Sequence, residues 1–220
     1  MIGYYGFGYD SRVNDYKLVC LTRNEVHAYT LKSNSWRRFN TVRHGYCPRI
    51  TPGLLLNGVL YWSAAATSGE NHKFIVSFDI SSEEFTKFPF PEEIIQRPKI
   101  SGAILRVLGD SLCLVCGIRD VGVDIWVMQN YGVMESWVKK FTTSQRKITS
   151  YSHLLKLYWP IKTDEILMQV SEGLALYDDK DDRVRLLNFI AINGRFDFLK
   201  SESYVESLVS LNPVLTRKIR

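Results

Sequence analysis

Apolar and polar positions alternate along much of this chain in short runs separated by turn-forming residues, a pattern typical of β-strands. One stretch, VHAYTLKSNSWRRF at residues 26–39, places Tyr29 and Trp36 on either side of a polar turn. The arrangement recurs at residues 75–88, 123–141 and 174–187, where the paired positions are Phe78 and Phe85, Trp126 and Trp137, and Tyr177 and Val184. The leading aromatic residues return about every fifty residues, so the chain is predicted to be built from repeats.

Each repeat contains two more apolar runs ahead of its aromatic hairpin. Residue pairs that tolerate tight turns, namely Asn-Asp, Asn-Gly, Gly-Asp and Thr-Asp, introduce the second of these runs. Each repeat is therefore interpreted as four antiparallel strands, and four-stranded repeats of about forty to fifty residues indicate a β-propeller. The predicted blades cover residues 4–39, 52–90, 100–141 and 152–190. Because a small sheet cannot bury both faces alone, we expect the aromatic residues to pack between neighbouring blades.

The stretch SYVESLVSL at residues 203–211 also alternates as a strand, but no further strands complete a fifth repeat. Propellers commonly close by joining strands from the two ends of the chain. The predicted fold class is therefore all-β, a kelch-like β-propeller of four-stranded antiparallel blades, with four complete blades and a partial closing blade. We expect one domain over residues 1–211, incomplete at its N-terminus, followed by a basic tail at residues 212–220.

Composition narrows the cellular setting. A net charge of +5 and 45% hydrophobic residues are ordinary for a globular chain of 220 residues. Neither a long apolar run nor a secretory signal pattern occurs, so no membrane association is expected. The mild charge argues against nucleic acid as a partner. Four cysteines in a chain of this length favour a reducing compartment, the cytoplasm or the nucleus.

The motifs that could carry chemistry have simpler structural interpretations. Cys113 and Cys116 have metal or redox spacing, but in a strand their thiols point to opposite faces, and no second ligand pair accompanies them. The acidic runs at residues 81–84 and 177–182 fall at hairpin tips, where solvated turns are expected. The glycines of GFG, at residues 6–8, permit a close approach of the strand rather than bind phosphate. The histidines are scattered, and we expect no cofactor, metal or catalytic residue.

Seven segments, in order along the chain, resemble the plant F-box-associated interaction domain, a family that includes the S-locus F-box group. They are GFGYDSRVNDYKLVCL, VHAYTLKSNSWRRF, LLLNGVLYWSA, IVSFDISSEEFTKFPFP, VDIWVMQNYGVMESWVKKFT, LALYDDKDDRVRLL and YVESLVSL. In that family an N-terminal F-box binds the Skp1 subunit of an SCF ubiquitin ligase, and the associated domain captures the protein to be ubiquitinated. No Gly-Gly pair occurs in the sequence, so the likeness to kelch proteins concerns architecture rather than a motif.

The resemblance implies a non-catalytic substrate-recognition module of an SCF-type E3 ubiquitin ligase. Such a module would reach Skp1 and cullin only through an F-box, and no segment of these 220 residues resembles one. The expected partner is the protein substrate that is to be ubiquitinated.

The working surface is expected in loops, because the strands of a propeller are committed to packing. The loops between the second and third strands of a blade and the connections between blades should leave from the same end. They supply the candidate partner-binding residues His44, Tyr46, Arg49, His72, Arg97, Arg119, Arg146, Tyr151, Arg195 and Phe198. Arginine and aromatic side chains often dominate protein interfaces, and the basic character of this set predicts an acidic or phosphorylated partner segment.

Two alternative functions stay open. A propeller enzyme of the glycosidase or lactonase class would gather carboxylates at the central channel. The runs GLLLN, GAILRVL and LLKLYWP, which are expected to be innermost, carry no Asp or Glu and argue against this alternative. The other alternative is a truncated fragment without function.

Overall fold

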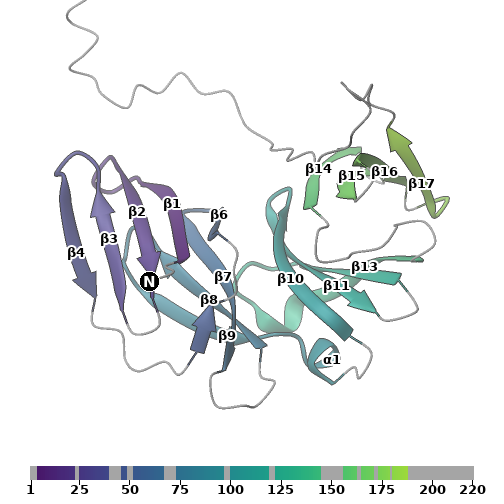
Figure 1. The fold of residues 1–220 in the computed structure, drawn as a ribbon, viewed down its shortest axis with the longest axis horizontal. Helices are drawn as coiled ribbons and strands as arrows, with labels where there is room; N and C mark the ends of the chain where they lie inside the picture. Colours follow the sequence, from purple (N-terminus) through teal and green to yellow (C-terminus); the bar gives the residue numbers. More distant parts are fainter. Residues whose placement is uncertain are drawn as a thin grey trace, which may run out of the picture.

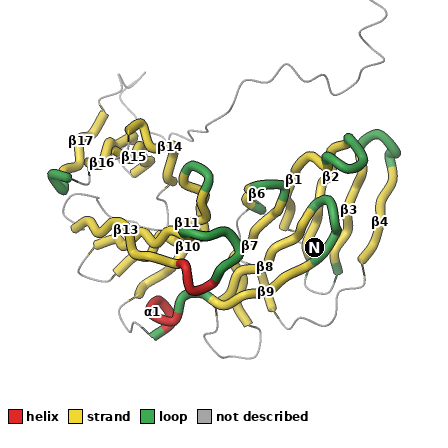
Figure 2. The backbone as a smooth tube through the Cα atoms, turned by 180° about the vertical axis from the view of Figure 1, so that it is seen from behind, coloured by secondary structure: helices red, strands yellow, loops and turns green. Residues whose placement is uncertain are grey.

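The computed structural model describes residues 4–22, 25–39, 46–48, 52–66, 73–96, 100–118, 122–144, 156–162, 165–170, 173–178 and 180–187. Within these residues the strands form four antiparallel sheets that follow one another in chain order (Figure 1). The same succession is seen from behind in Figure 2. The all-β prediction is confirmed. Among the described helices, none is long and apolar enough to cross a membrane.

The elements of each sheet are as follows. The first sheet contains β1 (Tyr4–Asp10), β2 (Asp15–Leu21), β3 (Val26–Thr30) and β4 (Ser35–Phe39). The second contains β5 (Tyr46–Pro48), β6 (Leu54–Leu56), β7 (Val59–Ala66), β8 (Lys73–Asp79) and β9 (Phe85–Pro89), and helix α1 (Glu92–Ile95) follows it. The third contains β10 (Ile100–Leu108), β11 (Ser111–Ile118), β12 (Gly122–Met128) and β13 (Trp137–Ser144), with the 3-10 helix η1 (Met134–Ser136) before β13. The fourth contains β14 (Lys156–Lys162), β15 (Glu165–Val170), β16 (Gly173–Asp178) and β17 (Arg183–Leu187).

The second sheet departs from the predicted four strands. Both β5 and β6 pair with β7: Tyr46 lies opposite Ala66, and Leu54 lies opposite Tyr61. The prediction that Tyr46 lies in a loop or connection is therefore wrong, because Tyr46–Pro48 is strand β5. A strand this short gives no periodic signal of its own, and it exists because the far half of β7 offers it a free edge.

Successive side chains of a strand point to opposite faces of its sheet, so both faces of an inner sheet can pack against neighbouring sheets. In β8, Phe74, Val76 and Phe78 belong to the core between the first and second sheets. Ile75, in between, belongs to the core between the second and third sheets. A third core joins the third and fourth sheets around Ile125, which is fully buried. Each inner sheet is thus covered on both faces, as face-to-face sheet packing requires.

The strands β1, β6, β10 and β14 of successive sheets lie next to one another. Strand β1 contacts β6 and β7, and β10 contacts β6, β7 and β14. In Figure 1 the later strands of the first and fourth sheets, β2 to β4 and β15 to β17, lie successively farther out from β1 and β14. Such a radial order of antiparallel sheets is how repeated sheets protect their edges.

The aromatic residues of the repeat fill the spaces between sheets in three of the four units. Phe78 packs against Phe39 of the first sheet, with ring centroids 5.8 Å apart. Trp126 belongs to the core between the second and third sheets, and Tyr177 meets Phe141 at 6.4 Å across the third and fourth sheets. The first unit differs from this prediction, because Trp36 is 58% exposed and its ring contact among the described residues is with Tyr29 of its own sheet.

Glycines allow the inner strands to approach neighbouring side chains, as predicted. A Cβ atom on Gly8 would lie 2.3 Å from the Cδ1 atom of Ile80, and one on Gly6 would lie 2.8 Å from Cδ2 of Leu60. At Gly53 the added atom would meet the Trp62 ring at 2.6 Å. These positions need glycine because a side chain would force the first and second sheets, or β6 and β7, apart.

A group of charges in which only Arg37 is largely exposed ties the first sheet to the second. The Lys17 ammonium lies 2.8 Å from Oδ2 of Asp10 and 2.7 Å from Oε1 of Glu83, and it donates to the Ile80 carbonyl at 3.1 Å. The Arg37 guanidinium closes on the other oxygen of Glu83. We call these four side chains, Asp10, Lys17, Arg37 and Glu83, the Lys17 cluster. It fixes the turn between β8 and β9.

Burial shapes the ionisation of this cluster. Burial alone would raise the pKa of Asp10, but hydrogen bonds from Lys17, Ser81 and the Arg12 amide lower it below its ordinary value. Burial alone would lower the pKa of Lys17, but its bonds to Asp10 and Glu83 raise it. Both groups are therefore charged at neutral pH, and each depends on the other for compensation.

Candidate functional site

The predicted partner-binding residues are largely outside the part of the chain that the structure describes. This applies to His44, Arg49, His72, Arg97, Arg119, Arg146, Tyr151, Arg195 and Phe198. The remaining one, Tyr46, lies in β5 rather than in a loop. The partner-binding role of all ten residues stays a prediction.

The strand ends that flank these connections do share an edge. In the third sheet, Ile100 lies opposite Ile118, Ile118 opposite Gly122, and Gly122 opposite Ser144. The chain enters and leaves the sheet at this end of its strands, which we call the connection edge. The tight turns, such as the one between β8 and β9, lie at the opposite ends of the strands, which we call the turn edge.

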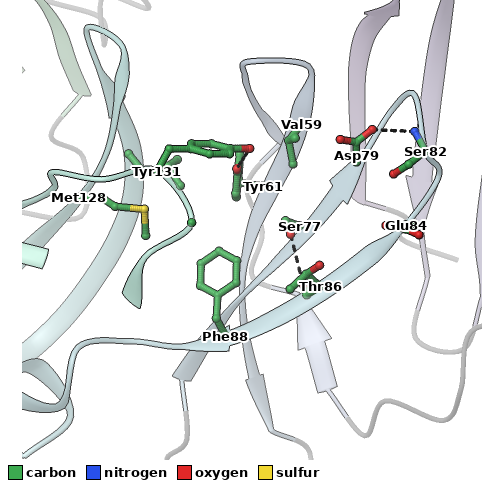
Figure 3. A pocket seen from close by; sticks show the side chains of 12 residues that line it. Val59, Tyr61, Ser77, Asp79, Ser82, Glu84, Thr86, Phe88, Met128 and Tyr131 are labelled. Carbon is green, nitrogen blue, oxygen red and sulfur yellow. Dashed lines mark hydrogen bonds between the residues drawn. The ribbon is translucent and has the colours of Figure 1, made fainter. Parts of the chain in front are cut away.

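A pocket of about 240 Å³ lies between the second and third sheets near the turn edge. Figure 3 shows it from close by. We call it the inter-sheet pocket. Its lining residues are Val59, Tyr61, Ser77, Asp79, Ser82, Glu84, Thr86, Phe88, Leu112, Met128, Tyr131 and Gly132. They come from β7, β8, β9 and the β8–β9 turn on one side, and from β11, β12 and the loop after β12 on the other.

One end of the inter-sheet pocket is aromatic. The Tyr61 ring stands edge-on to Phe88 at 6.4 Å and to Tyr131 at 6.3 Å between centroids. The Tyr61 hydroxyl donates a hydrogen bond to the Tyr131 hydroxyl, which ties the second sheet to the loop of the third. Burial raises the pKa of Tyr61, and the bond to Tyr131 raises it further. The phenol therefore stays neutral and keeps its proton for this bond.

The loop that carries Tyr131 is held in place by Ser136. The Ser136 hydroxyl receives a hydrogen bond from the Asn130 amide at 3.1 Å and lies 2.6 Å from the Val133 carbonyl, to which it donates. Gly132 adopts a φ of +75°, which other residues rarely adopt. This internal bonding presents the Tyr131 ring, 49% exposed, at the mouth of the pocket.

The other end of the inter-sheet pocket is acidic. Oδ1 of Asp79 accepts hydrogen bonds from the Ser81 and Ser82 amides at 2.8 and 2.7 Å, so this carboxylate shapes the turn and stays beside the pocket (Figure 3). Glu84 is exposed, and its carboxylate makes no ion pair with any described residue. Neighbouring Glu83, in contrast, points away into the Lys17 cluster.

Space for the pocket arises from small polar residues at positions that face the third sheet. Ser77 and Thr86 lie opposite each other on β8 and β9. The Ser77 hydroxyl donates to the Thr86 carbonyl at 3.4 Å. Ile75, two residues earlier on the same face, fills the core fully. The change from a large apolar side chain to a hydroxyl opens the gap between the sheets toward the turn edge.

A second pocket, of about 470 Å³, lies beyond the same loop. Its lining residues are Pro89, Phe90, Pro91, Glu92, Glu93, Ile95, Glu135 and Trp137. It combines three carboxylates with an apolar floor. Both pockets along the junction of the second and third sheets are therefore lined by acidic side chains, unlike the basic set predicted for the loops at the connection edge.

The expected structural role of the cysteine pair fits the structure. Cys113 belongs to the core shared by the third and fourth sheets, and Cys116 to the core shared by the second and third. Their thiols thus face opposite ways, and burial raises the pKa of Cys113 to about 12. Within the described residues, no group of three or more His, Cys, Asp or Glu side chains could hold a metal ion.

The expected solvated turns are confirmed only in part. Lys180, Asp181 and Asp182 are exposed. In the run at residues 81–84, however, Ser81 donates to Asp10 at 3.0 Å and Glu83 pairs with Lys17. The interpretation of Ser81 and Glu83 as solvated is therefore wrong. Ser81 and Glu83 make these contacts because Asp10 and Lys17 of the first sheet lie directly opposite this turn.

The residues of the inter-sheet pocket were not among the predicted site residues. One signal was available in the sequence: Ser77 interrupts the otherwise apolar run FIVSF, at residues 74–78, at a position that alternation assigns to the core. A polar residue at such a position marks either a hydrogen bond or a cavity. The loop after β12 gave another signal, because it is longer than its counterparts in the other repeats.

Comparison with known proteins gives a consistent answer. Residues 1–214 match the family described as F-box associated beta propeller domain. The F-box protein CPR1 of Arabidopsis thaliana is 29% identical over 98% of this chain and 59% of its own length. The F-box/kelch-repeat protein At3g23880 of Arabidopsis thaliana is 29% identical over 94% of this chain and 56% of its own length. The chain thus spans under two thirds of these relatives.

Among solved structures, the WD40 domain of SCAP from fission yeast aligns with 81% of this chain and 40% of its own length. The sequence identity is 14% and the TM-score is 0.36.

Proposed function

Because the chain belongs to the F-box associated beta propeller domain family, we propose that it is the substrate-recognition domain of an F-box protein in an SCF-type E3 ubiquitin ligase. The match over residues 1–214 carries this proposal. Relatives with F-box names align with almost the whole of this chain but with only 59% and 56% of their own lengths. The additional length in those proteins leaves room for a separate F-box.

The division of labour follows from this assignment. An F-box docks Skp1 and, through it, cullin, while this domain holds the protein to be ubiquitinated. Such a receptor works in the cytoplasm or the nucleus. It needs no chemistry of its own, because ubiquitin is transferred by other subunits.

A binding role also fits the inner strands better than an enzyme does. β6 and β10 carry no Asp or Glu, so they offer no carboxylate pair for a glycosidase. Asp10, at the end of β1, is engaged by Lys17 and fully buried. A propeller enzyme therefore remains the weaker alternative.

We also propose the finer architecture, a kelch-like propeller domain over residues 1–211 with a basic tail at 212–220. The outer face of the first sheet presents exposed rings, with Tyr5 56% exposed, Phe7 49% and Trp36 58%. A face this apolar calls for a covering element. The alternating segment at 203–211 is the proposed cover, as one strand of a closing blade.

Deletion of residues 203–220 tests this closure. The shortened chain should bind more of the dye ANS than the whole chain, because the rings become accessible. The same deletion combined with Phe7→Ser and Trp36→Ser should bind less dye than the deletion alone. Equal dye binding by the whole and the shortened chain would refute the closing role.

The ligase assignment is tested by co-precipitation with purified Skp1. The 220-residue chain should fail to bind Skp1, whereas the same chain fused behind the F-box of CPR1 should bind it. Proximity labelling in plant cells with the fusion should then enrich a protein whose ubiquitination depends on this domain. Stable binding of Skp1 by the chain alone would contradict the proposed division of labour.

A further inference from the structure

We infer that the inter-sheet pocket receives a lysine or arginine side chain of the captured protein. This inference rests on the proposed function, because it names the chemistry of a contact that a substrate receptor would make. It concerns the turn edge, which is distinct from the connection edge and its predicted basic residues.

Charge is the first reason. The pocket lining contains the carboxylates of Asp79 and Glu84 and no Lys, Arg or His. Neither carboxylate makes an ion pair with any described residue. An occupant with one positive charge would find two unneutralised negative charges.

The nearby cations of the protein are engaged elsewhere. Lys17 and Arg37 both bind Glu83. Lys87, on β9, lies over the Phe74 ring at 3.9 Å, on the face of the sheet that points away from the pocket. No described basic side chain is therefore placed to fill the pocket from within, and the charge is left for a partner.

Shape is the second reason. The pocket is aromatic at one end, with Tyr61, Phe88 and Tyr131, and acidic at the other (Figure 3). Lysine and arginine have the same two-part character, an apolar stem and a charged head. The stem can lie along the rings while the head meets the carboxylates, and a cation near an aromatic face gains further attraction. A volume of about 240 Å³ suits one side chain rather than a folded segment.

The direct test is a titration of the 220-residue chain, labelled with ¹⁵N and with ¹³C in its tyrosines, followed by NMR. The probes are blocked tripeptides, Gly-X-Gly, in which X is lysine, arginine, norleucine or glutamate. Lysine and arginine peptides should shift the Tyr61 and Tyr131 signals. Norleucine and glutamate peptides should shift them at least about fivefold less at equal concentration, since the cation–π contact and the attraction of the neighbouring carboxylates are both lost.

Substitutions test whether the Glu84 carboxylate attracts the bound cation. Glu84→Gln should weaken binding of the lysine peptide about two- to fivefold, the range expected for the loss of one partly exposed ion pair. The matched control is Glu93→Gln, which alters an exposed glutamate on α1 that lines the second pocket. It should leave the affinity unchanged. Because exposed Glu84 lies outside the core, its variant should fold, and amide spectra verify this. Raising sodium chloride to 0.5 M should weaken wild-type binding independently of any substitution.

Several outcomes would overturn the inference. Equal shifts with the norleucine peptide would mean an apolar site, and stronger shifts with glutamate would mean the wrong charge. Shifts of the same signals by calcium chloride alone, saturating below the peptide concentrations, would mean a metal site. No shift of Tyr61 or Tyr131 with 10 mM of any peptide, on the order of the weakest affinities of single side chains, would mean no site.

The failure of this inference can be told apart from failure of the proposed function. If the F-box fusion captures and ubiquitinates a protein equally well with Glu84→Gln and without it, the receptor role stands and the pocket is not used. If the fusion captures no protein but the lysine peptide still binds, the pocket stands and the receptor role falls.

Discussion

Replacing Lys17 should lower the free energy of unfolding more than replacing an exposed charged residue does. The side chain is 6% exposed and lies between Asp10, 1% exposed, and Glu83, 16% exposed. Lys17→Met keeps the apolar stem but leaves the buried Asp10 carboxylate without a cation, while Glu83 keeps only its exposed partner Arg37. Removing one partner of a buried ion pair costs about 3–5 kcal/mol. We expect the free energy of unfolding to fall by that amount.

A second substitution separates the charge effect from packing. Asp10→Asn in the Lys17→Met background removes the unpaired buried charge, so the double variant should recover about half of the loss. The control is Arg183→Met, which breaks a pair of 3.6 Å in which the two side chains are 79% and 57% exposed. It should change stability by less than about 1 kcal/mol.

Urea unfolding at pH 7, followed by circular dichroism, measures all four proteins. Similar dependence on urea concentration would verify that the same surface is exposed in each case. If Lys17→Met costs no more than Arg183→Met, or if Asp10→Asn adds to its cost, then the Lys17 cluster is not a coupled group. The reasoning from burial would then be refuted.

The same cluster predicts a pH profile. The pKa of Asp10 is lowered in the folded state, so its contribution is present above its ordinary value and is lost as the pH falls through the lowered one, below roughly pH 4. The pKa of Lys17 is raised, so its contribution is full below its ordinary value and is lost above roughly pH 10. The difference in unfolding free energy between wild type and the double variant should therefore shrink at both extremes.

Three further predictions address packing and reactivity. Gly53→Ala should cost about 1–3 kcal/mol in urea unfolding because its Cβ would meet the Trp62 ring at 2.6 Å, and the cost should be smaller in a Trp62→Phe background. Ile125→Ala, in the fully buried core of the third and fourth sheets, should cost about 2–5 kcal/mol, and a loss below 1 kcal/mol would mean that this core is not formed. Iodoacetamide at pH 8 should alkylate half-buried Cys20 before Cys113, whose pKa burial raises to about 12, and mass spectrometry should find equal labelling once urea unfolds the chain.

Local sequence rules predicted the strands and turns well. Alternation marks one face of each strand, and tight turns need particular residues. At the turn between β6 and β7, Asn57 and Gly58 have φ angles of +50° and +77°, the left-handed pair for which Asn-Gly is the favoured sequence. Such signals depend on a few neighbouring residues, so they can be found without knowing the rest of the fold.

Contacts between sheets could not be predicted in the same way. Asp10 and Glu83 lie 73 positions apart in sequence and meet at Lys17 only because the first sheet docks on the second in one register. Solvent exposure was the reasonable expectation for Glu83, since a glutamate at a hairpin tip is usually hydrated. Lys17 alternates with Val19 and Leu21, so the sequence places a lysine at a core-facing position, where a carboxylate is needed nearby. The sequence of β2 alone does not indicate which carboxylate that is.

The inter-sheet pocket combines both kinds of information. The extra residues of the loop after β12 are visible in sequence, and so is the serine at position 77. Each has an ordinary explanation by itself. Only the docking of the third sheet on the second places Tyr131 over Tyr61 and brings the loop to the gap that Ser77 leaves. Since loops change more readily than packed strands, a family that keeps one scaffold can alter such a pocket through the length of this loop without disturbing the cores on either side.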